Sequence, residues 1–223
     1  VHCYFVVCHV LVKLVFVDRD LVCLLYFNSA NSINISRIFA QVCYYVEAFA
    51  QLTTQQQKDA VFAIPSGNFG NLTAGLIAKV IGLPVKRFIA ATNSNDTVPR
   101  FLHEHIWNPH QTQATLSNAM DVSNPNNWPR IQHLLDVGLI AENVLTAVAV
   151  SEQETIDTVK QLDGLGYLSE PHAAVAFHAL QMSLQPGEFG VFLGTAHPAK
   201  FQESVETILS RAIDVPEVLL AAS

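Results

Sequence analysis

The chain has 223 residues, of which 50% are hydrophobic and 14% are charged, and its formal net charge is −7. This composition is typical of a globular protein with one substantial core. Because the balance is acidic and no cluster of lysine or arginine interrupts it, the sequence argues against a nucleic acid as a partner.

The first 27 residues are unusually apolar, and we interpret them as a diverged segment. Lys13 and Asp18–Asp20 interrupt this segment well short of the ~20 uninterrupted residues that a membrane-spanning helix needs, so no membrane partner is expected. The segment also lacks the basic start and the small-residue cleavage site of a signal peptide.

All cysteines lie within the first 43 residues, and they include no Cys-x-x-Cys pair. Buried free thiols are therefore favoured over a zinc site, and no metal is predicted. Because nothing suggests a disulfide framework, the expected location is cytoplasmic. The cysteines are Cys3, Cys8, Cys23 and Cys43.

A polar loop over residues 28–37 leads into a predicted helix that ends near Phe49. The guanidinium of Arg37 has two parallel donors that match a phosphate, and the alternative for this residue is a salt bridge at the surface. One face of the helix is apolar and is expected to be buried. This face contains Ile38, Val42, Tyr45, Val46 and Phe49.

Residues 61–75 are the stretch of the sequence that is most informative about a binding site. An apolar run with the length of a buried parallel strand stops at Pro65, and a loop of Ser, Gly and Asn precedes a helix that begins near Asn71. Free N–H groups and the partial positive charge at a helix N-terminus favour a phosphate. We expect Gly67 and Gly70 to permit a tight turn and a close approach to the ligand. The alternative is an ordinary strand-to-helix turn.

The loop does not match two well-known phosphate motifs. It lacks the Gly-Lys-Ser/Thr ending of a nucleotide P-loop and the third glycine of the dinucleotide fingerprint. Gly82 and Pro84 are expected to end the helix, and residues 85–91 are predicted to form the next buried strand. A strand–helix–strand unit predicts a parallel sheet with a right-handed crossover. The anion site should then lie at the carboxyl edge of that sheet.

The rest of the chain continues the alternation of helices and strands. Residues 92–97 are predicted to be a polar turn before a short helix, and Ser151 with Glu154 forms a capping box. We expect the loop histidines to be solvated rather than metal ligands; they are His103, His105 and His110. The further predicted elements are helices over 128–135, 151–162 and 169–180 and a strand over 189–193.

Three separated segments have a more specific signature. They read Asn-Ser-Ala-Asn-Ser-Ile-Asn-Ile-Ser-Arg over 28–37, Ser-Gly-Asn-Phe-Gly-Asn over 66–71 and Gly-Thr-Ala-His-Pro-Ala-Lys-Phe over 194–201. In this order they resemble the threonine synthase family, in its longer bacterial form. Residues 28–216 share the resemblance, which includes the segments 88–93 and 116–122.

The resemblance implies an enzyme that uses pyridoxal 5′-phosphate (PLP) and converts O-phosphohomoserine and water into threonine and phosphate. The implied fold is that of PLP fold-type II, which is similar to the tryptophan synthase β-subunit: an open, mostly parallel α/β sheet with flanking helices, here incomplete. Residues 28–216 would form the PLP-binding α/β domain, and residues 217–223 would form a tail.

The resemblance also implies site residues. The 66–71 loop would bind the cofactor phosphate, and a Ser-x-Asn-x-x-Arg element would bind the substrate phosphate. The hydroxyl of Thr195 would meet the pyridine nitrogen, although this residue could also cap a helix that has Pro198 in its first turn. The implied cofactor residues are Ser66, Gly67, Asn68, Phe69, Gly70, Asn71 and Thr195, and the implied substrate residues are Ser32, Asn34 and Arg37. Residues 116–121 resemble an active-site loop to which we assign no role.

The family's catalytic lysine forms a Schiff base with PLP, and it lies upstream of every segment matched here. None of the six lysines of this chain has the expected surroundings, so no catalytic residue is assigned. The chain therefore resembles the C-terminal half of the enzyme, and the missing N-terminal half is the expected partner. The alternatives are a non-catalytic product of a truncated or decayed gene and a serine or threonine dehydratase of the same fold type.

Overall fold

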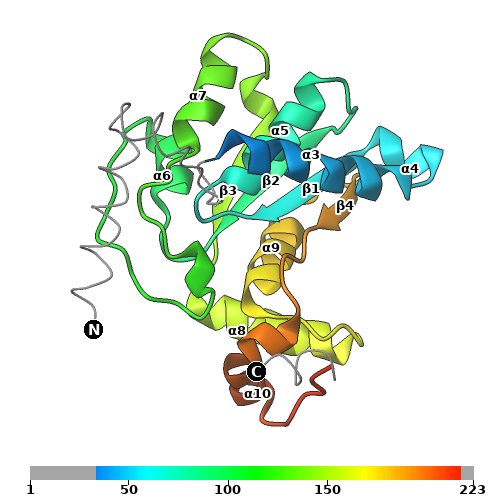
Figure 1. Ribbon diagram of the computed structural model, residues 1–223, viewed down its shortest axis with the longest axis vertical. Helices are drawn as coiled ribbons and strands as arrows, with labels where there is room; N and C mark the ends of the chain where they lie inside the picture. The colour runs from blue at the N-terminus through cyan, green and yellow to red at the C-terminus, as the bar shows by residue number, and fades with distance from the viewer. Residues whose placement is uncertain (1–33, 217–223) are drawn as a thin grey trace, which may run out of the picture.

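The computed structural model describes residues 34–216 (Figure 1). The expectations for residues 1–27 and 217–223, for Ser32, and for Cys3, Cys8 and Cys23 lie outside this range, and Cys43, which was expected to be a buried thiol, is exposed on α3. The helices are α3 (Ile35–Ala50), α4 (Thr54–Lys58), α5 (Gly70–Val80), α6 (Thr97–Glu104), α7 (Trp128–Asp136), α8 (Glu152–Gly164), α9 (Pro171–Ser183) and α10 (Gln202–Leu209). The strands are β1 (Ala60–Pro65), β2 (Arg87–Thr92), β3 (Leu145–Ala149) and β4 (Phe189–Phe192), and short 3₁₀ turns are η1 (Asn118–Met120), η2 (Glu142–Val144) and η3 (Pro198–Phe201).

The four strands form one parallel sheet in the order β3-β2-β1-β4. Phe62 on β1 is paired with Phe88 on β2 and with Val191 on β4. The predicted parallel α/β architecture is confirmed. The sequence analysis did not predict β3, an edge strand that is only partly buried and whose sequence, Leu-Thr-Ala-Val-Ala, does not alternate strictly between apolar and polar residues.

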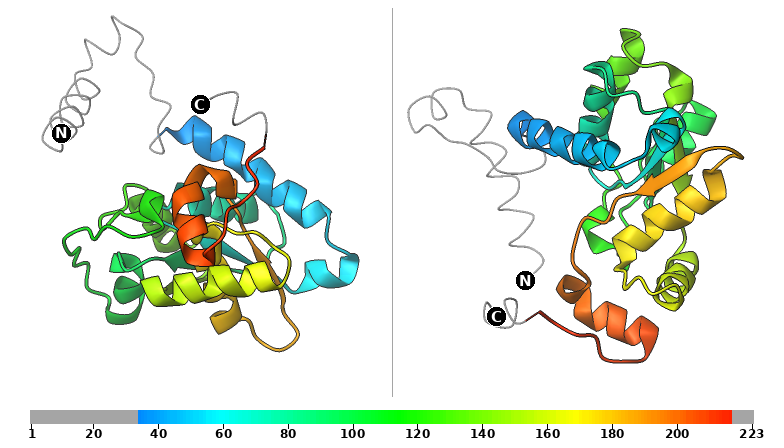
Figure 2. Two further views of the ribbon diagram at one scale, coloured as in Figure 1. Left: turned by 90° about the horizontal axis from the view of Figure 1, so that it is seen from below. Right: turned by 90° about the vertical axis from the view of Figure 1, so that its right-hand side faces the viewer.

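Every residue of β1 and β2 is buried, because helices cover both faces of the sheet. Alternate residues along each strand point to opposite faces. Phe62 and Phe88 pack with Tyr45 of α3 and Leu72 of α5, whereas the neighbouring residue Val61 packs with the helix α9. Figures 1 and 2 show the same layers, with α3 and α5 on one face and α9 on the other.

Local signals placed most helix boundaries well. Asn34 caps α3, whose buried residues are Ile38, Val42, Tyr45 and Phe49, whereas Val46 is exposed, contrary to expectation. The Ser151–Glu154 capping box at the start of α8 is confirmed. Among residues 34–216, no helix combines the length and the apolar character needed to cross a membrane.

Candidate functional site

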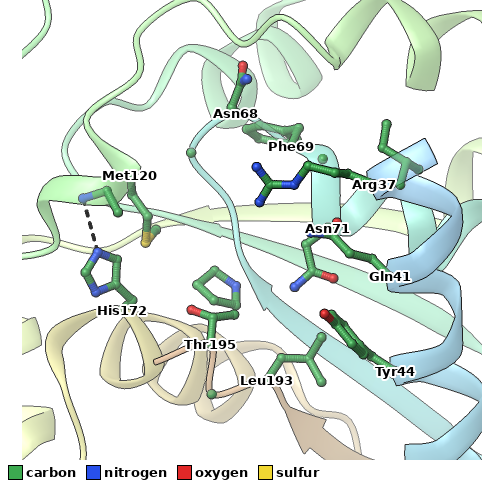
Figure 3. Close-up of a pocket in the computed structure, with 16 residues that line it drawn as sticks. Arg37, Gln41, Tyr44, Asn68, Phe69, Asn71, Met120, His172, Leu193 and Thr195 are labelled. Carbon is green, nitrogen blue, oxygen red and sulfur yellow. Dashed lines mark hydrogen bonds between the residues drawn. The ribbon is translucent and has the colours of Figure 1, made fainter. Parts of the chain in front are cut away.

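A pocket of about 610 Å³ opens at the carboxyl edge of the sheet, where the anion site was expected (Figure 3). Five segments that are distant in the sequence form its wall: α3, the β1–α5 turn, η1, the first turn of α9 and the end of β4. The lining residues include Arg37, Ile38, Gln41, Tyr44, Pro65, Gly67, Asn68, Phe69, Gly70, Asn71, Ala119, Met120, His172, Leu193, Gly194 and Thr195. All three segments of the sequence signature therefore reach one cavity.

The sharp turn between β1 and α5 falls on Phe69 rather than on a glycine. Its φ of 60° lies in the left-handed region, which is unfavourable for a residue with a side chain. The buried Phe69 ring packs edge to face against Trp128, with 5.8 Å between the ring centroids. Packing thus holds the strained residue, and α5 begins at Gly70 with no side chain capping its N-terminus.

Gly67 permits a close backbone approach, but the approach is to another part of the protein. A Cβ atom built at Gly67 would lie 2.6 Å from the Cα of Met120, which is too close for any real contact. Gly67 makes room for the η1 turn, and it also lines the pocket beside that turn. Its role in binding a cofactor stays a prediction.

The side chains of two polar residues of the 66–71 loop bond to the protein rather than facing the cavity. The buried Ser66 donates its hydroxyl to the carbonyl of Ile64 (2.9 Å) and is not among the residues that line the pocket. The Asn68 side chain points away from the cavity in Figure 3, and its Oδ1 accepts the N–H of Asn126 (2.6 Å). Of these two, only Asn68 borders the pocket.

Asn71 is the polar side chain of the loop that faces the cavity. The hydroxyl of Tyr45 donates to the Asn71 Oδ1 (2.9 Å) and also lies 2.8 Å from the Asn71 carbonyl. Burial raises the pKa of Tyr45 well above its ordinary value, so the hydroxyl keeps its proton. With its oxygen held in this way, Asn71 turns its amide nitrogen towards the pocket as a donor (Figure 3).

The helix α3 contributes the cationic side of the pocket. The guanidinium of Arg37 extends from this helix towards the Phe69 turn (Figure 3). Asn34, from the same predicted element, is not among the lining residues, and its Oδ1 instead accepts the N–H of Ser36 (2.9 Å) as the helix cap. Of the described members of the element, only Arg37 reaches the cavity.

Gln41 is a pocket residue that sequence reasoning missed. It lies one turn after Arg37 on α3, and both side chains line the cavity. The Oε1 atom of Gln41 is buried and has no hydrogen-bond partner among residues 34–216. A buried carbonyl without a donor is costly, so this atom suits a ligand that supplies one. Its i+4 spacing from Arg37 was the available sequence signal.

Thr195 lies just beyond β4, on the side of the cavity opposite Arg37 (Figure 3). It is exposed, so its hydroxyl can reach a ligand. The alternative role as a helix cap is wrong, because His197 caps η3 by accepting the N–H of Ala199 at its Nδ1 (3.2 Å). Pro198 is the first residue of that 3₁₀ turn, as expected.

The loop that carries η1 is held by a buried polar network. Asn93, directly after β2, donates to the Thr115 hydroxyl (2.8 Å) and to the Asp121 carboxylate (2.9 Å). The same carboxylate accepts the N–H (3.0 Å) and the hydroxyl (2.7 Å) of Thr115. These bonds position Ala119 and Met120 in the pocket wall, which gives the 116–121 loop a role that the sequence did not.

Metal binding finds no support within residues 34–216, where no three potential ligands of the His, Cys, Asp or Glu type cluster together. The expected solvated histidines His103, His105 and His110 are all exposed.

The sequence of the chain is similar to those of known threonine synthases. Residues 173–222 match the family model "Threonine synthase, C-terminal". A curated threonine synthase of Escherichia coli (strain K12) is 60% identical over 95% of this chain, which covers 50% of that protein. The chain thus spans about half the length of the curated relatives it matches.

Solved structures agree with this match. The crystal structure of threonine synthase from Escherichia coli has a TM-score of 0.91 and 59% identity, covering 96% of this chain and 50% of that one. A structure titled PLP-bound threonine synthase from Brucella melitensis has a TM-score of 0.84 and 30% identity, covering 95% and 51%. Maize serine racemase, at 16% identity and a TM-score of 0.55, covering 78% of this chain and 53% of that one, shares the fold alone.

Proposed function

We propose that this chain, which corresponds to the C-terminal half of threonine synthase, supplies the phosphate-binding parts of an enzyme that makes threonine and phosphate from O-phosphohomoserine and water. One observation carries the proposal: Arg37, the 67–71 turn and Thr195 are far apart in the sequence and line one cavity. The cavity has the size of a typical site for a cofactor or a small molecule.

The residues of the pocket fit PLP. Its phosphate would be bound at the uncapped N-terminus of α5 and by the amide nitrogen of Asn71, where backbone donors and the helix dipole favour an anion. The hydroxyl of Thr195 would contact the pyridine nitrogen. Bound PLP supplies an electron sink that stabilises negative charge on the substrate carbons.

The phosphate of the substrate would be bound by Arg37, with a contribution from Ser32 of the same element, whereas Asn34 caps α3 and does not line the pocket. A guanidinium offers two parallel donors to phosphate oxygens. Such binding holds and orients the substrate, and by itself it does not lower the reaction barrier.

The catalytic base must come from another part of the enzyme. None of the lysines within residues 34–216 lines the pocket: Lys58, Lys79, Lys86, Lys160 and Lys200 all lie elsewhere. We propose that the preceding half of the enzyme supplies the lysine and covers the exposed apolar residues of α3, which are Ile35, Phe39, Tyr44 and Val46. The expected cytoplasmic location is part of the same proposal.

Calorimetric titration of this chain tests the cofactor site. PLP should bind, whereas pyridoxal, which lacks the phosphate, should bind more weakly by about tenfold or more, because the charge-assisted hydrogen bonds of the phosphate are lost. Equal affinity for the two compounds would refute the assignment of the phosphate site. A matched variant, Arg37→Met, should weaken O-phosphohomoserine binding and leave PLP binding nearly unchanged.

Activity is tested by adding the missing half. The chain alone should form no measurable threonine from O-phosphohomoserine and PLP, because removing a proton-transfer group costs ~10²–10⁴-fold in rate. The N-terminal half of the Escherichia coli enzyme, expressed separately or fused in frame, should restore phosphate release. Turnover by the chain alone would contradict the proposal, and borohydride trapping would then identify the lysine that is used.

A non-catalytic descendant of the same family would bind PLP but remain inactive with the added half. This outcome would separate the alternative role from the proposed one.

A further inference from the structure

A buried acid–histidine pair lies beside the pocket, and none of the functions above uses it. Glu170 and His172 begin α9 and are 1% and 3% exposed, respectively. The Glu170 carboxylate accepts the N–H groups of His172 (2.7 Å) and Ala173 (2.8 Å), so it caps the helix. Its Oε2 also lies 2.5 Å from the His172 Nδ1.

The contacts of the imidazole determine where its proton is. A carboxylate with two backbone N–H donors acts as an acceptor, so the Nδ1–H of His172 donates to Glu170. On the other side of the ring, Nε2 accepts the N–H of Ala119 at 3.2 Å (Figure 3). An N–H group cannot accept, so Nε2 has no proton. His172 is therefore neutral and carries its proton on Nδ1.

The hydrogen bond between Ala119 and His172 links the imidazole, through η1, to the 66–71 loop, the proposed phosphate site. Ala119 and Met120 belong to η1, and the backbone of Met120 leaves no room for a Cβ atom at Gly67, a residue of the 66–71 loop that lines the pocket. The His172 ring also packs against Phe201 of η3, with 4.6 Å between the ring centroids. His172 thus contacts η1, which is part of the pocket wall, and η3, which is outside it, and through η1 it is linked to Gly67.

We propose that His172 is a positioning residue that holds η1 against Gly67 through its Nε2 acceptor, with Glu170 selecting the required tautomer. The hydrogen bond and the position of η1 follow from the contacts above. The consequence for PLP binding rests on the proposed function, because it requires the 66–71 loop to bind the cofactor phosphate.

Nuclear magnetic resonance on the 223-residue chain tests the tautomer directly. A long-range ¹H–¹⁵N spectrum should show His172 with a protonated Nδ1 and an unprotonated Nε2, and the Ala119 amide should be protected from hydrogen exchange. His178 of the same helix, which contacts Thr158 rather than η1, is the matched control. A proton on Nε2 would overturn the proposal, and so would a rapidly exchanging Ala119 amide in the folded chain.

Two substitutions separate hydrogen bonding from packing. His172→Gln keeps an acceptor near the Nε2 position, whereas His172→Phe keeps a ring against Phe201 and has no acceptor. We expect Gln to preserve the protection of Ala119 and the affinity for PLP, and Phe to weaken PLP binding by about fivefold, the effect of one hydrogen bond. His178→Gln should leave both measurements unchanged.

The opposite order, with Phe tolerated and Gln damaging, would show that His172 acts through packing and would refute the positioning role. If the wild-type chain shows the expected tautomer and a protected Ala119 amide but does not bind PLP, the positioning role stands and the proposed cofactor site fails. If a variant does not fold, the tautomer measured on the wild-type chain still decides the proposal.

Discussion

The polar groups at the amino ends of the strands (the amino edge) are paired with one another, whereas several of those at the carboxyl ends (the carboxyl edge) have no partner among the described residues. At the amino edge, Arg87 makes a bidentate contact with Glu188, with distances of 2.6 Å (Nη2–Oε2) and 3.0 Å (Nε–Oε1), and also donates to the carbonyl of Ser183 (2.7 Å). The Glu188 side chain is 1% exposed, and Lys86 adds a longer contact to it (3.5 Å). The charged groups of this edge satisfy one another.

At the carboxyl edge, several polar groups lack a hydrogen-bond partner in the part of the chain that the structure describes. The N-terminus of α5 has no side-chain cap, Phe69 holds a left-handed backbone, and Gln41 buries a carbonyl oxygen without a donor. A protein tolerates such features where a ligand completes them. Changes at the amino edge should therefore affect stability, and changes at the carboxyl edge should affect binding.

The largest expected effect comes from breaking the buried ion pair. Arg87→Met leaves the buried Glu188 carboxylate with only the Gln185 N–H and the longer contact to Lys86, which should lower the free energy of unfolding by about 3 kcal/mol. Urea denaturation followed by circular dichroism measures this loss. Lys86→Met is the control, because Lys86 is largely exposed and its removal should change little. A small effect of Arg87→Met would show that the amino edge does not stabilise the fold.

Acid should weaken the same edge. Hydrogen bonds from Arg87 lower the pKa of Glu188 from its ordinary value of 4.5 to about 2. A carboxyl group with a lowered pKa stabilises the fold above its unfolded-state pKa, and this contribution is lost as the pH falls from about 4.5 towards 2. Unfolding measured across this range should show a decline that Glu188→Gln reduces. An unchanged pH dependence in that variant would assign the acid sensitivity to other carboxyl groups.

At the carboxyl edge, adding one methyl group should disturb the pocket. Gly67→Ala places a Cβ atom 2.6 Å from the Met120 Cα, and such overpacking typically costs about 1–3 kcal/mol. The variant should also bind PLP more weakly, because η1 has to move. Gly164→Ala is the control, since no atom lies within 4 Å of the added carbon. If Gly67→Ala retained full stability and PLP affinity, the tight contact with η1 would have no functional importance.

The smallest effect separates stability from binding at one residue. Gln41→Leu removes a buried carbonyl without a partner, so the free energy of unfolding should rise by about 1 kcal/mol. The affinity for O-phosphohomoserine should fall by about fivefold, because the ligand loses a hydrogen-bond partner. Thermal unfolding and calorimetric titration measure the two quantities. A rise in stability with unchanged affinity would remove Gln41 from the binding site.

Local patterns in the sequence determined the fold class and most of the elements. Residues 61–65 and 88–91 are continuous apolar runs, because helices cover both faces of their strands. The Ser151–Glu154 box marked a helix start through bonds between close neighbours in the chain. The β3 strand was not predicted, because it is short and its apolar residues neither form a long run nor alternate strictly with polar ones.

Only the tertiary structure decided which residues of the signature segments face the pocket. Ser66 and Asn34 are polar members of those segments that do not line the pocket. The hydroxyl of Ser66 donates to the Ile64 carbonyl at the end of β1, and the side chain of Asn34 caps α3. His172 and Gln41 stood outside the signature and reach the cavity through α9 and α3. Spacing along the chain identifies neighbours on one helix or strand, whereas the convergence of five segments depends on how helices pack on a sheet, which no local pattern encodes.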